Sequence, residues 1–156
     1  MKNTYNTQIL DIIPSTVDEG KGRIIDGYVK LKINDIEFWA FALEDWRTGK
    51  WSLSMKGSNL SLKLSFLNLN IQASEKKIKQ IVPIPNQKKP CDYIIYGEVV
   101  DKVPSSKLPD KYERLQVGCG FVVGGVSVAK NQFKIGDYIQ AEGRLDAYRV
   151  KEADEL

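Results

Sequence analysis

The sequence predicts an all-β protein, and three observations favour this fold class. Apolar and polar residues alternate with a period of two in several separate segments, the pattern of strands with one buried face. Pairs of turn-forming residues separate these segments. Only one short segment has the spacing of a helix. We therefore expect a small, strongly curled β-barrel or two packed antiparallel sheets, with at most one short helix.

The clearest alternation follows the turn-forming pair Gly136-Asp137 and predicts one long strand over residues 138–148. Glycine at position 143 indicates a bend in this strand or the close approach of another segment of backbone. We expect an exposed, weak row of charges at Glu142, Arg144 and Asp146. The residues expected to be buried are Ile139, Ala141, Leu145 and Ala147, and those expected to be largely exposed are Gln140, Glu142 and Arg144.

This segment resembles late strands of OB-fold barrels, a group that includes single-stranded-DNA-binding proteins. The resemblance consists of an apolar-Gly-Asp turn followed by a strand that contains Glu-Gly-Arg-Leu, and it covers residues 135–145 only. It implies an OB-like fold more than a function. The residues that carry it are Ile135, Gly136, Asp137, Glu142, Gly143, Arg144 and Leu145.

Earlier segments predict further strands. Residues 4–13 form a candidate first strand, and the pair Asn34-Asp35 predicts a hairpin between residues 23–33 and 36–41. A second hairpin, centred on Thr48-Gly49, would place Trp46 opposite Trp51. The alternation in residues 60–71 changes phase near position 66, which predicts a β-bulge or a sharp bend there.

The middle of the sequence is less regular. Residues 74–82 have helical spacing, although a short strand is a close alternative. The proline-rich residues 83–90 are the best candidate for a domain boundary, but we expect one β domain over residues 1–156. Residues 93–103 and 115–123 predict strands, and Gly124-Gly125 predicts a tight turn.

A short motif of glycine, a charged residue, apolar residues and aspartate occurs three times, beginning at Gly22, Gly97 and Gly143. We interpret these copies as equivalent strands of two related half-barrels.

Composition narrows the chemistry. The sequence has no histidine, and therefore lacks the commonest general base and metal ligand. Its acidic residues have no spacing typical of a metal site, so we expect no catalytic residues, metal or cofactor. We expect Cys91 and Cys119 to be reduced and buried. No signal-peptide core and no run of about 18 apolar residues is present, so we expect a cytoplasmic protein with no membrane partner.

Charge is unevenly distributed along the chain. Residues 46–91 contain nine cations and one anion, a net charge of +8, whereas the whole chain carries +3 and the remainder therefore −5. Two tryptophans lie in the same segment. Cations beside aromatic side chains are typical of proteins that bind single-stranded DNA or RNA. The candidate nucleic-acid-binding residues are Trp46, Arg47, Lys50, Trp51, Lys56, Lys63, Lys76, Lys77, Lys79, Lys88 and Lys89.

Each part of this hypothesis has an alternative. The two tryptophans would equally fill one end of the core, and the lysines would equally keep outer strand faces solvated and block edge pairing. Two other functions therefore stay open, namely a structural or adaptor subunit that binds a protein partner, and a barrel that holds a small apolar ligand. Salt separates nucleic-acid binding from the adaptor function, because nucleic-acid affinity falls steeply as salt rises.

Overall fold

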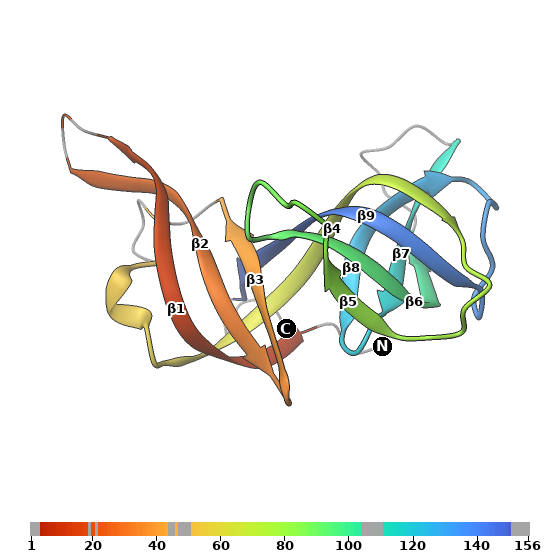
Figure 1. The fold of residues 1–156 in the computed structure, drawn as a ribbon, viewed down its shortest axis with the longest axis horizontal. Helices are drawn as coiled ribbons and strands as arrows, with labels where there is room; N and C mark the ends of the chain where they lie inside the picture. The colour runs from red at the N-terminus through yellow and green to blue at the C-terminus, as the bar shows by residue number, and fades with distance from the viewer. Residues whose placement is uncertain are drawn as a thin grey trace.

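The computed structural model describes residues 4–18, 20, 22–43, 46, 51–103 and 111–150. This part of the chain consists of nine strands and a single 3-10 turn, η1 (Leu53–Met55), which confirms the all-β prediction (Figure 1). None of its helices is long and apolar enough to cross a membrane. The strands are β1 (Thr4–Asp18), β2 (Arg23–Ile33), β3 (Ile36–Ala42), β4 (Asn59–Ala73), β5 (Gln80–Pro83), β6 (Asp92–Val103), β7 (Tyr112–Gly118), β8 (Val122–Ala129) and β9 (Tyr138–Arg149).

All nine strands belong to one mixed sheet with the order β1-β2-β3-β9-β4-β8-β7-β6-β5. Additional pairings of β1 with β4 and of β6 with β9 close this sheet into a ring. The alternative of two packed antiparallel sheets is wrong for two reasons. The hydrogen-bonded pairing is continuous across the whole sheet, and β3–β9 and β4–β8 are parallel neighbours.

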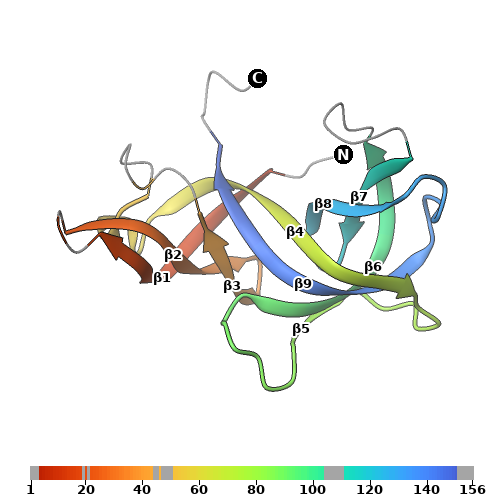
Figure 2. The same ribbon diagram turned by 90° about the horizontal axis from the view of Figure 1, so that it is seen from above.

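The long antiparallel pair β4–β9 belongs to two closed circuits of five strands. One circuit runs β1-β2-β3-β9-β4 and returns to β1, and the other runs β6-β7-β8-β4-β9 and returns to β6. Figure 2 shows β4 and β9 crossing the middle of the molecule, with β1, β2 and β3 on one side and β6, β7 and β8 on the other. We call these the first and second circuits.

The two circuits have equivalent pairings, with β1, β2, β3 and β4 corresponding to β6, β7, β8 and β9. The turns before β4 and β9 repeat the same hydrogen bonds. The Ile9 amide donates to the Ser58 carbonyl (2.9 Å), as the Val99 amide does to that of Asp137 (2.8 Å). The Gly57 amide donates to the Ile9 carbonyl (2.7 Å). The Gly136 amide donates likewise to the carbonyl of Val99 (2.8 Å). The second half of the chain therefore repeats the backbone design of the first.

An approximate two-fold axis passes through the cross-strand pair Phe66–Leu145, whose side chains are both fully buried. The pairs on either side, Leu64–Ala147 and Asn68–Gly143, exchange under this rotation. A Cβ atom on Gly143 would overlap the carbonyl oxygen of Leu67. The expected close approach of backbone at Gly143 is therefore confirmed, and it occurs where the two circuits share their strands.

A bulge in the first strand of each circuit carries the same residue type. The register shifts between Ile9 and Asp11 in β1 and between Val99 and Asp101 in β6. Each aspartate accepts a hydrogen bond from the next backbone amide, at 2.9 Å for Asp11 and 2.8 Å for Asp101. The repeat is visible in the sequence as Ile9-Leu10-Asp11 and Val99-Val100-Asp101.

The motif interpreted as marking equivalent strands is wrong in that role. Its copies beginning at Gly22, Gly97 and Gly143 lead into or lie in β2, β6 and β9, which occupy three different places in the circuits. The reason is that glycine and aspartate serve turns and close approaches in any strand, so a short motif built from them carries little positional information.

Several local predictions are confirmed. Asn34-Asp35 joins β2 to β3, and Asn34 has the positive φ of 54° that such a tight turn requires. The predicted bulge in β4 lies between Asn68 and Asn70, slightly beyond the expected position. Cys91 and Cys119 are both free and buried. Residues Thr48 and Gly49, the centre of the other expected hairpin, lie outside the described residues.

Two local patterns differ from their first interpretation. Residues 74–82 form no helix, and β5 confirms the short-strand alternative, because its backbone pairs with β6 and a helix of that length has little stability alone. The proline-rich segment therefore ends β5 at Pro83 and continues as the connection, residues 84–91, between the two strands of a hairpin. The pair Gly124-Gly125 lies within β8, where a register shift opposite β7 accommodates it, and the turn lies at residues 119–121.

The burial of β9 follows the prediction on one face only. Its four expected core residues, Ile139, Ala141, Leu145 and Ala147, are at most 2% exposed. Gln140, Glu142 and Arg144 are half-buried and not largely exposed, and Asp146 is buried. The reason is that β9 has β4 along one edge and β6 and then β3 along the other, so side chains of these neighbours on the outer face pack against its own, as Phe41 does against Arg144.

Candidate nucleic-acid interface

The two predicted aromatic residues lie in the core. Trp46 is 8% exposed and Trp51 is 1% exposed, and their side chains stack with centroids 6.2 Å apart. The indole Nε1 of Trp46 donates a hydrogen bond to the carbonyl oxygen of Ala42 (2.7 Å). Trp46 and Trp51 are therefore not available to stack on bases, and the alternative that they fill one end of the core is confirmed. Both side chains pack at one end of the first circuit, because large indoles bury apolar area where an internal acceptor satisfies the N–H.

The predicted cations lie at several separate places. Lys56 forms an exposed ion pair with Asp11 (3.6 Å), and Lys79 forms one with Glu98 (3.4 Å). Lys63 is on β4. The remaining predicted cations are in connections: Lys76 and Lys77 between β4 and β5, and Lys88 and Lys89 between β5 and β6, while Arg47 and Lys50 lie outside the described residues. That these cations form one nucleic-acid-binding face stays a prediction.

A different set of aromatic side chains lies on the outer face of β2 and β3. Strand alternation directs Val29 and Phe38 into the core, and it directs Tyr28, Trp39 and Phe41 outward, where each is half-buried. Tyr28 is directly opposite Phe41, and their ring centroids are 5.5 Å apart.

Lysines flank these aromatic residues on the same face. Lys30 is opposite Trp39, and Lys32 lies two residues further along β2. We call this set of Tyr28, Lys30, Lys32, Trp39 and Phe41 the aromatic face. The sequence signal for the aromatic face was the alternation of these residues with core residues along the predicted hairpin.

Arg144 adds a cation beside the aromatic face. Its guanidinium lies 4.7 Å from the centroid of the Phe41 ring, in a cation–π contact. Its Nε and Nη2 atoms donate to the two carboxylate oxygens of Asp146, at 2.6 and 3.1 Å. Burial raises the pKa of Asp146, while the hydrogen bonds from Arg144 oppose that change. The bidentate pair holds the guanidinium in place against Phe41.

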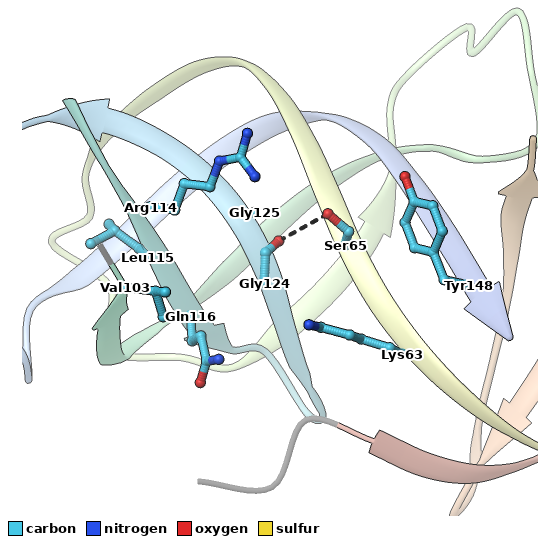
Figure 3. A pocket seen from close by; sticks show the side chains of 9 residues that line it. All are labelled: Lys63, Ser65, Val103, Arg114, Leu115, Gln116, Gly124, Gly125 and Tyr148. Atoms are coloured by element: carbon cyan, nitrogen blue, oxygen red, sulfur yellow. Dashed lines mark hydrogen bonds between the residues drawn. The ribbon is translucent and has the colours of Figure 1, made fainter. Parts of the chain in front are cut away.

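A cleft of about 390 Å³ with both polar and apolar lining opens on the second-circuit side of the β4–β9 pair (Figure 3). A smaller cleft of about 240 Å³ shares four of its residues and includes Arg144, so that the two clefts adjoin. Ser65 donates a long hydrogen bond of 3.4 Å to the carbonyl oxygen of Gly124 within the larger cleft. The larger cleft is lined by Lys63, Ser65, Val103, Arg114, Leu115, Gln116, Gly124, Gly125 and Tyr148.

The described residues include no group of three or more cysteines and acidic residues arranged to hold a metal ion. Burial raises the pKa of Cys91 to about 11 and that of Cys119 to about 12. Both thiols are therefore protonated near neutral pH, and neither has the thiolate that a nucleophile needs.

No family model, curated protein or solved structure matches the chain in comparisons with each of these groups.

Proposed function

We propose that this protein binds single-stranded nucleic acid across the aromatic face, with Arg144 beside it. The observation that carries the proposal is the presence of Tyr28, Trp39 and Phe41 on the outer side of one hairpin, between cationic side chains. Bases stack on such side chains whatever their identity, and the cations neutralise the backbone phosphates. The partner would be a flexible strand of DNA or RNA whose bases are unpaired.

The arrangement of the strands supports the same proposal. An OB fold is a five-stranded barrel that binds oligonucleotides on the face of its second and third strands. Each circuit here has five strands, and β2 and β3 are the second and third strands of the first circuit. The OB-like motif of residues 135–145 includes the turn and the first part of β9. We therefore interpret the molecule as two OB-like barrels that share β4 and β9.

The proposal assigns different roles to the side chains of this surface. Trp39 and Tyr28 offer their rings for stacking, and Phe41 keeps Arg144 in place through its ring. Lys30 is only partly neutralised, since it lies 3.8 Å from Glu37 in an exposed ion pair. No ion pair of Lys32 occurs with any other residue in the described ranges.

The test is titration with an unstructured oligonucleotide, followed by tryptophan fluorescence. Trp39 is half-buried whereas Trp46 and Trp51 are buried, so we expect stacking to quench mainly Trp39. Trp39→Ala should weaken binding by about 1–3 kcal/mol. Tyr112→Ala, which removes a 43%-exposed aromatic side chain from β7, is the matched control and should leave the affinity unchanged.

Salt dependence supplies the second measurement. The logarithm of the affinity should fall linearly with that of the salt concentration, because each neutralised phosphate releases counterions. Lys30→Gln with Lys32→Gln should flatten this slope. The pair Lys88→Gln and Lys89→Gln tests whether the lysines of the β5–β6 connection also contact the strand. Absence of binding at low salt, or equal losses for Trp39→Ala and Tyr112→Ala, would contradict the proposal.

A protein partner that adds a strand to β5 is the second candidate function. β5 is the last strand in the sheet order and, among the described residues, pairs with β6 alone, so its other edge has backbone groups available for pairing. Such a complex would tolerate high salt, whereas a nucleic-acid complex would dissociate. Protection of the β5 amides from hydrogen exchange, with no change on the aromatic face, would favour this candidate.

A further inference from the structure

We propose that the larger cleft between β4, β7, β8 and β9 binds the phosphate group of a hydroxylated phosphate ester, such as a sugar phosphate. Lys63 Nζ, the Arg114 guanidinium and Ser65 Oγ would contact the phosphate oxygens, and Gln116 would contact a hydroxyl of the same ligand. The Ser65 hydroxyl would exchange its long hydrogen bond to Gly124 for one to the phosphate. The cleft lies on the second circuit and shares no residue with the aromatic face. The inference therefore does not depend on nucleic-acid binding.

The first argument is the charge of the cleft. Lys63 and Arg114 come from different strands, β4 and β7, and line one cleft. Neither forms an ion pair with another residue in the part of the chain that the structure describes. Figure 3 shows the Lys63 ammonium directed toward the middle of the cleft, with Arg114 and Ser65 above it. An anion bound between these side chains would offset the repulsion of two like charges.

The second argument is an unsatisfied donor. The Nε atom of Arg114 is buried and has no hydrogen-bond partner among the described residues. A buried donor without a partner is costly, and the cost is larger when the group is charged. Arginine holds oxyanions through parallel N–H donors of fixed geometry. A phosphate oxygen beside the Arg114 guanidinium would supply the missing acceptor once a small shift of the side chain opens Nε to the cleft.

The third argument concerns what is attached to the phosphate. Gln116 Oε1 is also buried without a partner among the described residues. This oxygen is an acceptor, as are the charged oxygens of a phosphate, so it needs a donor from another part of the ligand. A hydroxyl carried by the ligand would satisfy it. The volume of about 390 Å³ lies near the lower end of the range for small-molecule sites, about 300–1,000 Å³, and exceeds the need of one phosphate group.

The test begins with inorganic phosphate and ribose 5-phosphate, each titrated into the full chain at low salt. Binding is followed by the nitrogen–proton resonance of Arg114 Nε in the isotope-labelled protein. We expect a saturable shift with both probes and a higher affinity for the sugar phosphate. Lys63→Met and Arg114→Met should each weaken binding at least about tenfold, the effect of losing a charge-assisted hydrogen bond.

Matched variants separate this site from general attraction to a positive protein. Lys134→Met removes one positive charge from an exposed turn and should leave both affinities unchanged. Gln116→Leu should remove the preference for ribose 5-phosphate and leave the affinity for inorganic phosphate intact. A shift that does not saturate, or an equal loss in Lys134→Met and Lys63→Met, would overturn the proposal. Arg114→Met keeps an unbranched apolar stem and removes the unsatisfied Nε together with the rest of the guanidinium, so the variant should stay folded.

An oligonucleotide with and without a 5′-phosphate identifies the source of the ester. If a strand end occupies the cleft, the phosphate raises the affinity and Arg114→Met removes the gain. Equal affinities, together with saturable binding of ribose 5-phosphate, assign the cleft to free sugar phosphates. Failure of both oligonucleotides to bind would contradict the function proposed for the aromatic face, and it would leave the proposal for the cleft standing.

Discussion

The outer faces of β2–β3 and β7–β8 occupy equivalent places in the two circuits, yet one is filled and the other is hollow. The approximate two-fold axis relates Tyr28 to Arg114 and Phe41 to Ser127. It relates Trp39 to the bulge at Gly124 and Gly125. Three aromatic rings therefore cover the first face, whereas glycine and serine leave space for a cleft in the second.

The inward residues of the same strands differ much less. Val29 and Leu31 of β2 correspond to Leu115 and Val117 of β7, and all four side chains are fully buried. Packing density constrains such positions to apolar residues of similar volume. The comparison teaches that buried positions have similar apolar residues in both halves, whereas the solvent-facing positions of the same strands have different residue types in each half.

The largest expected effect is at the centre of the shared strands. Leu145→Asp should destabilise the protein by more than about 5 kcal/mol, because it removes a buried leucine and introduces an unpaired carboxylate. The neighbouring Leu67→Asp should change the free energy of unfolding by less than about 0.5 kcal/mol, since Leu67 is 53% exposed and lies opposite Arg144. Urea unfolding measures both. Similar losses in the two variants would mean that the faces of β4 and β9 are assigned wrongly.

The tryptophan pair tests the first circuit alone. Trp51→Ala should destabilise the protein by about 3–5 kcal/mol, the cost of truncating a buried large aromatic side chain. Trp39→Ala, on the aromatic face, should cost much less stability and should affect nucleic-acid binding instead. Thermal unfolding and oligonucleotide titration of the same two variants distinguish these outcomes. A stable Trp51→Ala variant that no longer binds the oligonucleotide would show that Trp51 belongs to the binding site after all.

The bulge aspartates provide the most direct test of equivalence between the halves. Asp11→Ala and Asp101→Ala each remove a carboxylate that accepts one backbone amide, and each should cost about 1–2 kcal/mol. The ion pair of Asp11 with Lys56 is exposed and should add little. Urea unfolding of the two single variants should give values within a factor of two. Asp11→Ala with no effect would show that the bulges are alike in geometry but not in energy.

The smallest expected effect is a pH dependence that arises from the second half, where both cysteines lie. Folding raises the pKa of Cys91 to about 11, so the folded state retains the thiol proton at pH values where the unfolded state has lost it. The contribution to stability is complete below about pH 9 and is lost as pH rises toward 11. Between pH 8 and pH 10 the loss should be about 1 kcal/mol for this thiol. Cys91→Ala should lose correspondingly less stability over this interval.

The sequence predicted the strands well, because alternation is a local property. It identified the hairpin at Asn34-Asp35 and the core residues of β9. It could not predict that β4 and β9 pair along their length, since that pairing joins residues far apart in the chain. The sequence left open whether Trp46 is buried or exposed, because its burial depends on an acceptor at Ala42 and on space beside Gly27.

The same difference between local patterns and long-range contacts decided which candidate sites could be predicted. The net charge of residues 46–91 is a property of the sequence, but its lysines belong to separate connections in the fold. The residues of the larger cleft come from β4, β6, β7, β8 and β9, so no continuous segment of sequence contains them. Tyr28 and Phe41 were within reach, because they alternate with core residues in a hairpin that was correctly predicted.

The shared strand β9 also determines when this protein is able to fold. β9 is the last strand of the chain that the structure describes, and both circuits need it for closure. A ribosome therefore completes β1 to β4 long before Phe41 has its partner at Asp146. Until then the edges of β3, β4 and β6 lack that neighbour, which is the condition under which nascent β proteins associate wrongly. Truncation before β9 should therefore abolish both circuits at once and yield aggregated chains.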